Sequence, residues 1–150
     1  MQIWIDGDAC PKPIKEIVFR AAMKRQVPLF LVANHFIPMP ASNWIKRIMV
    51  ESGFDKADSY IVEHVSENDL VITSDIPLAD FVVAKKAIAL NPKGMLYTKE
   101  NIKQILAMRN LNESLRSTGV ISGGGSQLSP KEIQEFSNHL DKIITQQHRL

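Results

Sequence analysis

Hydrophobic positions along the chain follow two different spacings, and segments of the two kinds alternate. Short apolar runs rich in Ile, Val and Leu are typical of buried strands, whereas apolar residues three and four positions apart are typical of amphipathic helices. The predicted strands cover residues 3–5, 29–33, 70–73 and 87–90, and the predicted helices cover 11–25, 58–65, 76–86, 98–116 and 129–146. Within residues 44–51, the apolar run 48–50 fits either another strand or the end of a helix.

Polar residues stand at several of the predicted helix starts. Asp58, Asp75 and Thr98 occupy positions expected of N-caps, where a side-chain oxygen accepts a hydrogen bond from the first turn. Residues 129–132, with the sequence Ser-Pro-Lys-Glu, have the pattern of a capping box with proline at the first helical position. Residues 117–128 include four glycines and predict a flexible loop before the last helix.

The alternation of strands and helices predicts an α/β fold. Parallel strands need long crossover connections, so helices between strands favour a mainly parallel sheet of about five strands. Helices are expected on both faces of this sheet, in three layers. A chain of 150 residues without internal repeats is expected to form a single domain, residues 1–150.

Polar residues follow several of the predicted strands, and right-handed crossovers bring the carboxyl ends of parallel strands to one edge of the sheet. Ligands of such sheets bind at this edge. Gly7 permits a turn that lets carboxylates two positions apart face one crevice. Asp58 joins the edge if the start of its helix lies nearby. The polar residues expected at the edge are Asp6, Asp8, Asn34, Ser74, Asp75 and Asn91.

Several carboxylates in one place repel each other, and a bound cation stabilises their ionised form. Carboxylate and amide oxygens without His or Cys suit Mg²⁺ or Mn²⁺, ions that bind phosphates and activate water for phosphoester cleavage. Asp58 and Asp75 are equally well explained as N-caps, whereas Asp6 and Asp8 cannot both cap the helix that follows them. The Asp6/Asp8 pair is therefore the stronger functional candidate. Cys10 is expected to be a small buried residue rather than a nucleophile.

Composition narrows the class of protein only slightly. Apolar residues make up 45% and charged residues 23% of the chain, and a net charge of +2 does not by itself call for nucleic acid. Lys12 and Lys15 of the first helix are candidates for a local basic surface, although solvated lysines are common on helices. No segment has the length of a membrane span, the first residues lack the pattern of a signal peptide, and the single cysteine fits a reducing compartment. We therefore expect a cytoplasmic protein.

Residues 3–11, Ile-Trp-Ile-Asp-Gly-Asp-Ala-Cys-Pro, resemble the opening Asp-Ala-Asp-Ala-Cys-Pro signature of the YaiI/YqxD family of bacterial proteins, with Gly7 in place of the usual alanine. The resemblance covers essentially the whole chain and continues through residues 31–34, 53–58, 69–79, 89–94 and 122–124. The family is grouped with PIN-domain nucleases, so the resemblance implies a PIN-like fold. It also implies an Mg²⁺ or Mn²⁺ site with Ser74 as a neighbouring polar ligand and with four carboxylates, Asp6, Asp8, Asp58 and Asp75.

The acids and the resemblance together predict a metal-dependent phosphodiesterase, a ribonuclease of PIN-like type with RNA as its partner. The predicted catalytic residues are Asp6, Asp8 and Asp75, and the predicted substrate-binding residues are Asn34, Ser74, Lys12 and Lys15. Two alternatives use the same edge. One is a non-catalytic module that binds RNA or a nucleotide. The other is a phosphatase of haloacid-dehalogenase type, in which an aspartate is the nucleophile.

Overall fold

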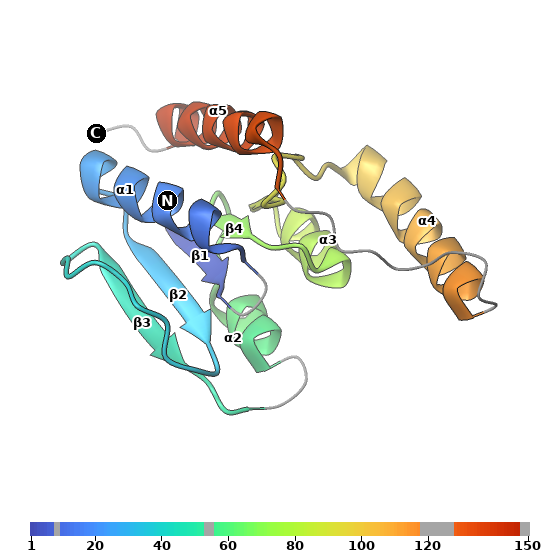
Figure 1. Ribbon diagram of the computed structural model, residues 1–150, viewed down its shortest axis with the longest axis horizontal. Helices are drawn as coiled ribbons and strands as arrows, with labels where there is room; N and C mark the ends of the chain where they lie inside the picture. The colour runs from blue at the N-terminus through green and yellow to red at the C-terminus, as the bar shows by residue number, and fades with distance from the viewer. Residues whose placement is uncertain (8–9, 53–55, 118–127, 148–150) are drawn as a thin grey trace.

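The computed structural model of the protein describes residues 1–7, 10–52, 56–117 and 128–147, with 109–117 and 147 as backbone only (Figure 1). Its sheet has the strand order β3-β2-β1-β4-β5, and all neighbouring strands are parallel. This confirms the predicted α/β fold and shows that residues 44–51 contain a strand. The strands are β1 (Ile3–Asp6), β2 (Leu29–Ala33), β3 (Ile45–Met49), β4 (Leu70–Ile72) and β5 (Ile88–Leu90).

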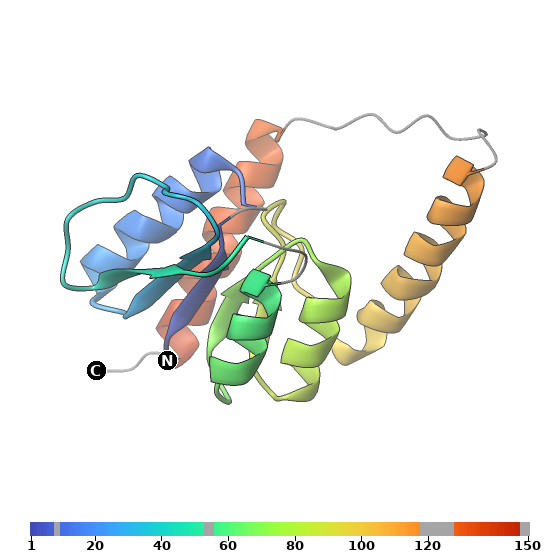
Figure 2. The same cartoon turned by 90° about the horizontal axis from the view of Figure 1, so that it is seen from below.

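Helices cover both faces of the sheet, which gives the three layers expected from the sequence (Figure 2). α1 and α5 share one hydrophobic core with the sheet, and α2 and α3 share a second core on the opposite face together with the start of α4. None of the described helices is long and apolar enough to cross a membrane. The helices are α1 (Lys12–Arg25), α2 (Lys56–His64), α3 (Ile76–Ala84), α4 (Lys99–Ser117) and α5 (Pro130–Gln147).

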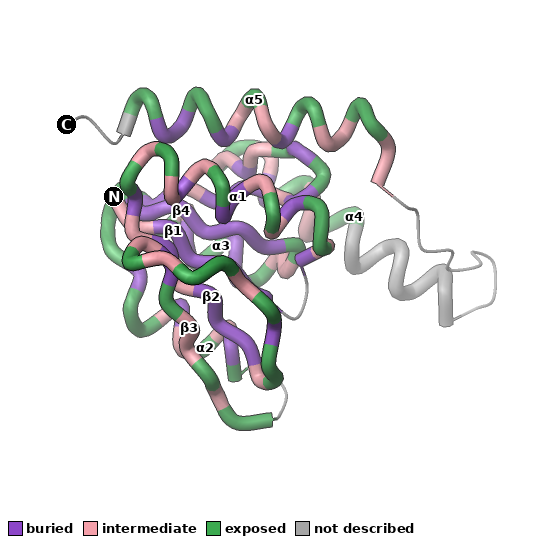
Figure 3. Tube along the Cα trace, turned by 60° about the vertical axis from the view of Figure 1, so that its left-hand side comes forward, coloured by how far each residue is buried: buried purple, intermediate pink, exposed green. Residues whose placement is uncertain are grey.

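The central strand β1 is buried on both faces, as Figure 3 shows for the middle of the sheet. Ile3 and Ile5 point into the core under α1 and α5, whereas Trp4 lies in the opposite core and stacks on Phe30 with ring centroids 4.5 Å apart. A strand with both faces buried must be apolar at every position rather than at alternate ones. This explains the continuous apolar run that begins the chain.

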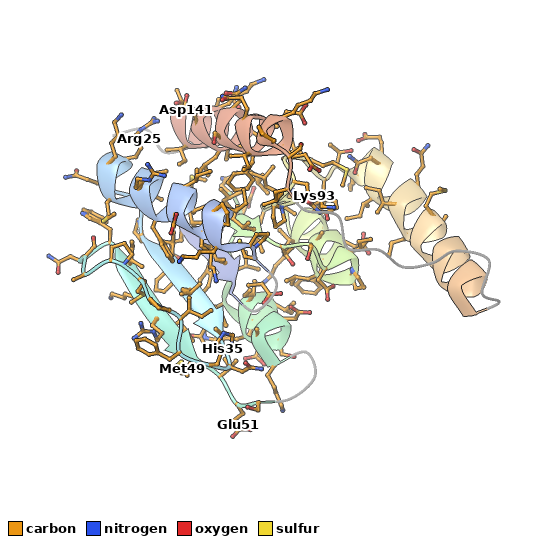
Figure 4. The ribbon with its side chains drawn as sticks, in the orientation of Figure 1. Arg25, His35, Met49, Glu51, Lys93 and Asp141 are labelled. Atoms are coloured by element: carbon orange, nitrogen blue, oxygen red, sulfur yellow. The ribbon has the colours of Figure 1, made fainter. Side chains whose placement is uncertain are left out.

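The two helices on one face are joined by an ion pair as well as by their core contacts. Arg25 at the end of α1 donates to Asp141 of α5 over 3.0 Å and to Thr145 over 3.0 Å, and Figure 4 shows the first pair facing each other. Asp141 is largely exposed. An exposed pair of this kind adds little stability, so the buried apolar residues between the helices hold them together.

Two of the predicted helix starts are confirmed by reciprocal hydrogen bonds. Thr98 and Asn101 each accept from the backbone amide of the other, and so do Ser129 and Glu132. The hydrogen bonds to the Glu132 carboxylate hold its pKa below the usual range. Because these side chains satisfy amides of the first helical turn, they establish where α4 and α5 begin.

The structure corrects the predicted start of α2 and shortens the predicted loop 117–128. α2 begins at Lys56, so Asp58 lies inside its first turn and is not the N-cap. The free backbone amides at a helix start stabilise a carboxylate at the N-cap and in the first turn alike. The sequence pattern therefore does not distinguish the two positions. The predicted loop 117–128 is shorter at its start because α4 extends to Ser117, and its glycines lie outside the described residues.

Gly94 lies where the connection between β5 and α4 packs against α5. Its φ is +96°, and a Cβ there would lie 2.9 Å from the Phe136 backbone nitrogen and 3.2 Å from the Glu132 carbonyl oxygen. We expect Gly94→Ala to lower the free energy of unfolding by about 2–4 kcal/mol, because a left-handed conformation and an overpacked backbone contact add their costs. Urea denaturation measures the change.

Gly7→Ala is the matched control for this prediction. A Cβ at Gly7 would also meet atoms at 2.9 Å, but these are the ends of the Leu31 and Ile37 side chains, which can shift, and its φ is not left-handed. Its loss of stability should be clearly smaller than that of Gly94→Ala. Equal losses in the two variants would contradict the role assigned to the Gly94 backbone.

Candidate functional site

The strand order brings several of the predicted polar residues to the same edge of the sheet. Asp6 is the last residue of β1, and β1 is paired on one side with β2 and on the other with β4. Asn34 follows β2, and Ser74 and Asp75 follow β4, so these residues flank Asp6 from both sides. Neighbouring strands lie about 4.8 Å apart. The topology therefore forms the edge that the sequence predicted, although Asp8 lies outside the described residues.

Asp6 occupies a buried position, with 6% of its surface exposed, at the centre of this edge. The nearby Cys10 is also buried, and burial raises the pKa of its thiol to about 12. Two charges modify this effect, since Lys15 lowers the thiol pKa and Asp6 raises it. Both charged groups therefore lie within electrostatic reach of Cys10. With this pKa the thiol stays protonated at neutral pH, which makes it a poor nucleophile.

Asp75 is held by hydrogen bonds on both sides. Its Oδ1 accepts from the Leu78 amide over 3.0 Å, which makes it the N-cap of α3, and its own amide donates to Oγ1 of the buried Thr73 over 3.0 Å. These contacts fix the carboxylate at the start of the helix and use one of its oxygens. A carboxylate can accept several hydrogen bonds or coordinate a cation with its second oxygen.

Tyr97 brings a further polar group to the ends of β4 and β5. Its hydroxyl oxygen accepts from Asn91 Nδ2 over 2.8 Å. Burial raises the pKa of Tyr97, the hydrogen bond from Asn91 lowers it, and the charge of Asp75 raises it again. Tyr97 therefore lies within electrostatic reach of Asp75. Tyr97 could not be selected from the sequence, because a tyrosine after a predicted strand carries no signal that distinguishes it from a core residue.

The remaining predicted site residues, Asp58, Asn34 and Ser74, lie on different elements along the edge. α2 carries the chain back from the carboxyl end of β3, so its first turn, with the half-buried Asp58, starts on the same side of the sheet (Figure 2). Asn34 Oδ1 lies 3.2 Å from Nδ1 of His35, a residue that no sequence pattern singles out. His35 lies just past the end of β2, and Met49 is the last residue of β3 (Figure 4). Ser74 is exposed.

The described side chains do not contain a complete metal site. Among them, no three His, Cys, Asp or Glu residues come close enough together to hold an ion. Asp6, Asp58 and Asp75 therefore bring carboxylate groups to one edge without forming a three-carboxylate cluster by themselves. The ligand chemistry of these residues fits Mg²⁺ or Mn²⁺, and Asp8, outside the described residues, is the remaining predicted ligand.

Lys12 and Lys15 lie beside a pocket on the α1 face of the sheet. The pocket has a volume of about 520 Å³ and is formed by the first turns of α1 and by residues 37–40 of the connection between β2 and β3. Lys12 is exposed and Lys15 is half-buried. The structure thus brings the two predicted substrate-binding lysines together on one wall of a cavity.

These features define a three-layer α/β protein with a carboxylate-bearing edge at the ends of its parallel strands. Residues 4–146 match the model of the family described as "Uncharacterized BCR, YaiI/YqxD family". The chain belongs to this family. No solved structure matches it.

Close relatives span the same length. A UPF0178 protein of Maridesulfovibrio salexigens is 57% identical over 145 residues, which cover 97% of this chain and 96% of the relative. A UPF0178 protein of Shewanella amazonensis is 57% identical over 144 residues, covering 96% and 97%. One from a Marinomonas species is 52% identical over 146 residues, covering 97% and 98%.

Proposed function

We propose that this protein is a metal-dependent phosphodiesterase, a ribonuclease of PIN-like type. The observation that carries the proposal is the position of Asp6 and Asp75 at the carboxyl ends of two adjacent parallel strands, β1 and β4. Ligands of parallel α/β sheets bind at this edge. The five-stranded parallel sheet with helices on both faces is consistent with a PIN-like fold.

In this proposal, Asp6 and Asp75 bind Mg²⁺ or Mn²⁺ together with Asp8, and Asp58 approaches from α2. The ion, when bound, supplies an activated water and neutralises charge on the phosphate. Thr73 holds the backbone of Asp75 through the hydrogen bond to its amide. Lys12 and Lys15 bind the phosphate backbone of RNA, and Asn34 and Ser74 contact the substrate at the edge.

Calorimetric titration with Mn²⁺ and Mg²⁺ tests the proposal on the wild type and on Asp6→Asn/Asp75→Asn. We expect the wild type to bind with micromolar to millimolar affinity and the double variant to lose this binding, because two ligand oxygens become amide groups. A fluorescent RNA assay with Mn²⁺ should show cleavage by the wild type alone. Thermal unfolding of both proteins checks that the variant is folded.

The matched control is Glu63→Gln/Glu67→Gln, which also removes two carboxylates. Both glutamates are exposed; Glu63 lies in the last turn of α2 and Glu67 in the turn before β4, at the opposite edge of the sheet. This variant should bind metal as the wild type does. Equal binding by the Asp6→Asn/Asp75→Asn protein would contradict the proposed site. Metal binding without RNA cleavage would favour the non-catalytic module that binds RNA or a nucleotide.

A further inference from the structure

We propose that the pocket between α1 and residues 37–40 binds one nucleotide, with the base against its apolar floor and the phosphate at its cationic rim. The inference rests on the proposed function in one respect, because the nucleotide would be one unit of the RNA substrate. The pocket itself is defined by the geometry of α1 and of the connection between β2 and β3. Nucleotide binding can therefore be tested without metal or turnover.

The pocket arises from the order of the strands. The chain moves from β1 to β2 through α1 and from β2 to β3 through residues 34–44, in the same direction across the sheet. Right-handed crossovers place both connections on the same face. Ile37 accordingly belongs to the same hydrophobic core as α1. The second connection has no helix, so it packs beside α1 without covering it fully (Figure 2).

The floor of the pocket is apolar and is part of the protein core. Phe19 of α1 is 4% exposed and Ile37 is 5% exposed, and the half-buried Met39 packs against the same core. Phe19 and Ile37 leave only a small part of their surface open to the pocket, and the half-buried Met39 adds to it together with the exposed Pro38 and Pro40, so the apolar surface is present without a rearrangement. A flat aromatic ring can pack on such a surface.

The wall formed by the second connection is held in place by Arg47 of β3. Its Nη2 donates to the Ile37 carbonyl oxygen over 3.0 Å, and its guanidinium lies over the Phe36 ring at 4.1 Å. The pocket is therefore formed before a ligand arrives. A preformed site binds more tightly because less conformational entropy is lost.

The charges at the rim define the chemistry of the ligand. Lys12, Lys15 and Arg20 contribute three cations, against one carboxylate from Glu16. An excess of positive charge above an apolar floor fits a molecule with a ring at one end and a phosphate at the other. The volume of about 520 Å³ is within the range of roughly 300–1,000 Å³ found for small-ligand pockets.

The pocket adjoins the carboxylate-bearing edge. A Cβ on Gly7, the residue after Asp6, would lie 2.9 Å from Cδ1 of Ile37, which lines the pocket. Lys15 lines the pocket from α1, whose first turn follows the end of β1 at Asp6. A nucleotide in the pocket would thus direct its phosphate to the end of α1 that is nearest to Asp6, which is where the next phosphodiester of an RNA would be cleaved.

The test is a titration in EDTA with three probes: adenosine 5′-monophosphate, adenosine and inorganic phosphate. We expect the monophosphate to bind at least about 10-fold more tightly than either fragment, because it combines the apolar and the charged contact. Amide chemical shifts should change in α1 and in residues 37–40. Lys12→Ala/Lys15→Ala should weaken monophosphate binding by at least about 10-fold and leave adenosine binding unchanged.

Two further variants test the charged rim and the apolar floor separately. Lys24→Ala/Lys142→Ala removes the same charge from exposed positions outside the pocket and should bind the monophosphate as the wild type does. Met39→Asp puts a negative charge against the floor and should weaken both adenosine and the monophosphate. Unchanged affinity in Lys12→Ala/Lys15→Ala would overturn the inference, and so would equal binding of inorganic phosphate and the monophosphate.

The outcomes for the pocket and for the proposed activity can be distinguished. Monophosphate binding that persists in Asp6→Asn/Asp75→Asn, in a protein whose wild type never cleaves RNA, would support the nucleotide pocket and contradict the nuclease. RNA cleavage by a wild type that does not bind the monophosphate in EDTA would support the nuclease and overturn the pocket assignment.

Discussion

Asp75→Asn is expected to fold as stably as the wild type and to lose at least about 100-fold of its metal-dependent RNA cleavage. Substitutions of groups that merely support metal ligands cost about 10–100-fold, so loss of a ligand should reach at least the upper end. The cap should survive, because an Asn oxygen can accept from the Leu78 amide nearly as well as Asp75 Oδ1 does now. Single-turnover cleavage with Mn²⁺ and urea denaturation measure the two effects.

Asp75→Ala separates capping from metal binding. It removes the acceptor for the Leu78 amide as well as the charge, so it should lose about 1 kcal/mol of stability in addition to activity. If Asp75→Asn cleaves RNA at the wild-type rate and only Asp75→Ala is impaired, through its stability, then Asp75 is a helix cap and not a metal ligand.

Asp69→Asn should lower the free energy of unfolding by about 2–4 kcal/mol, the largest loss of stability that we expect from a single isosteric change, because it weakens three hydrogen bonds to a buried carboxylate. Asp69 is 4% exposed at the amino end of β4. Its Oδ1 accepts from the Gln2 amide over 3.0 Å, and its Oδ2 accepts from Trp4 Nε1 over 3.1 Å and from the Ser66 amide over 3.0 Å.

An asparagine at this position has only one acceptor oxygen. Its NH₂ group would face at least one of the three N–H groups that now donate to Asp69. Two donors would then face each other, and the buried N–H would have no acceptor. Urea denaturation measures the loss, and metal binding should be unaffected because Asp69 lies at the opposite end of the strands from Asp6.

Trp4→Phe provides the control for Asp69→Asn. It keeps an aromatic ring that can stack on Phe30 and removes the Nε1 donor to Asp69. In a double-mutant cycle, Asp69→Asn should cost less in the Trp4→Phe background, because one of its three donors is already gone. Fully additive losses would contradict the network and attribute the effect to the buried charge alone.

The strand β3 shows where prediction from the sequence was ambiguous. Ile45 and Ile48 stand three positions apart with Lys46 and Arg47 between them, which does not alternate as a half-buried strand should. β3 is an edge strand paired only with β2, and of its five residues only Ile45 is buried. Its conformation is therefore decided by pairing with β2, which a local pattern does not contain.

The position of Asp6 and Asp75 at the sheet edge was predictable. Each follows a strongly apolar strand, and parallel strands have their carboxyl ends at the same edge of the sheet. The position of Tyr97 at this edge was not predictable, because it depends on the hydrogen bond with Asn91 and on the packing of Tyr97 with α4. The three acceptor contacts of Asp69 also escaped prediction. Two of them join residues 65 and 67 positions apart, and only a paired β1 and β4 bring these together.

The alternation of strands and helices, the parallel sheet and the places of Asp6 and Asp75 at its carboxyl edge could all be predicted from the sequence. These follow from hydrophobic periodicity and from the sterics of crossover connections, which are local or nearly local properties of a chain. The packing of residues 37–40 beside α1, which leaves a pocket with Lys12 and Lys15 at its rim, became visible only in the folded protein. An apolar loop residue such as Ile37 packs wherever the assembled core has room for its side chain. The residues next to it in the sequence do not specify that position.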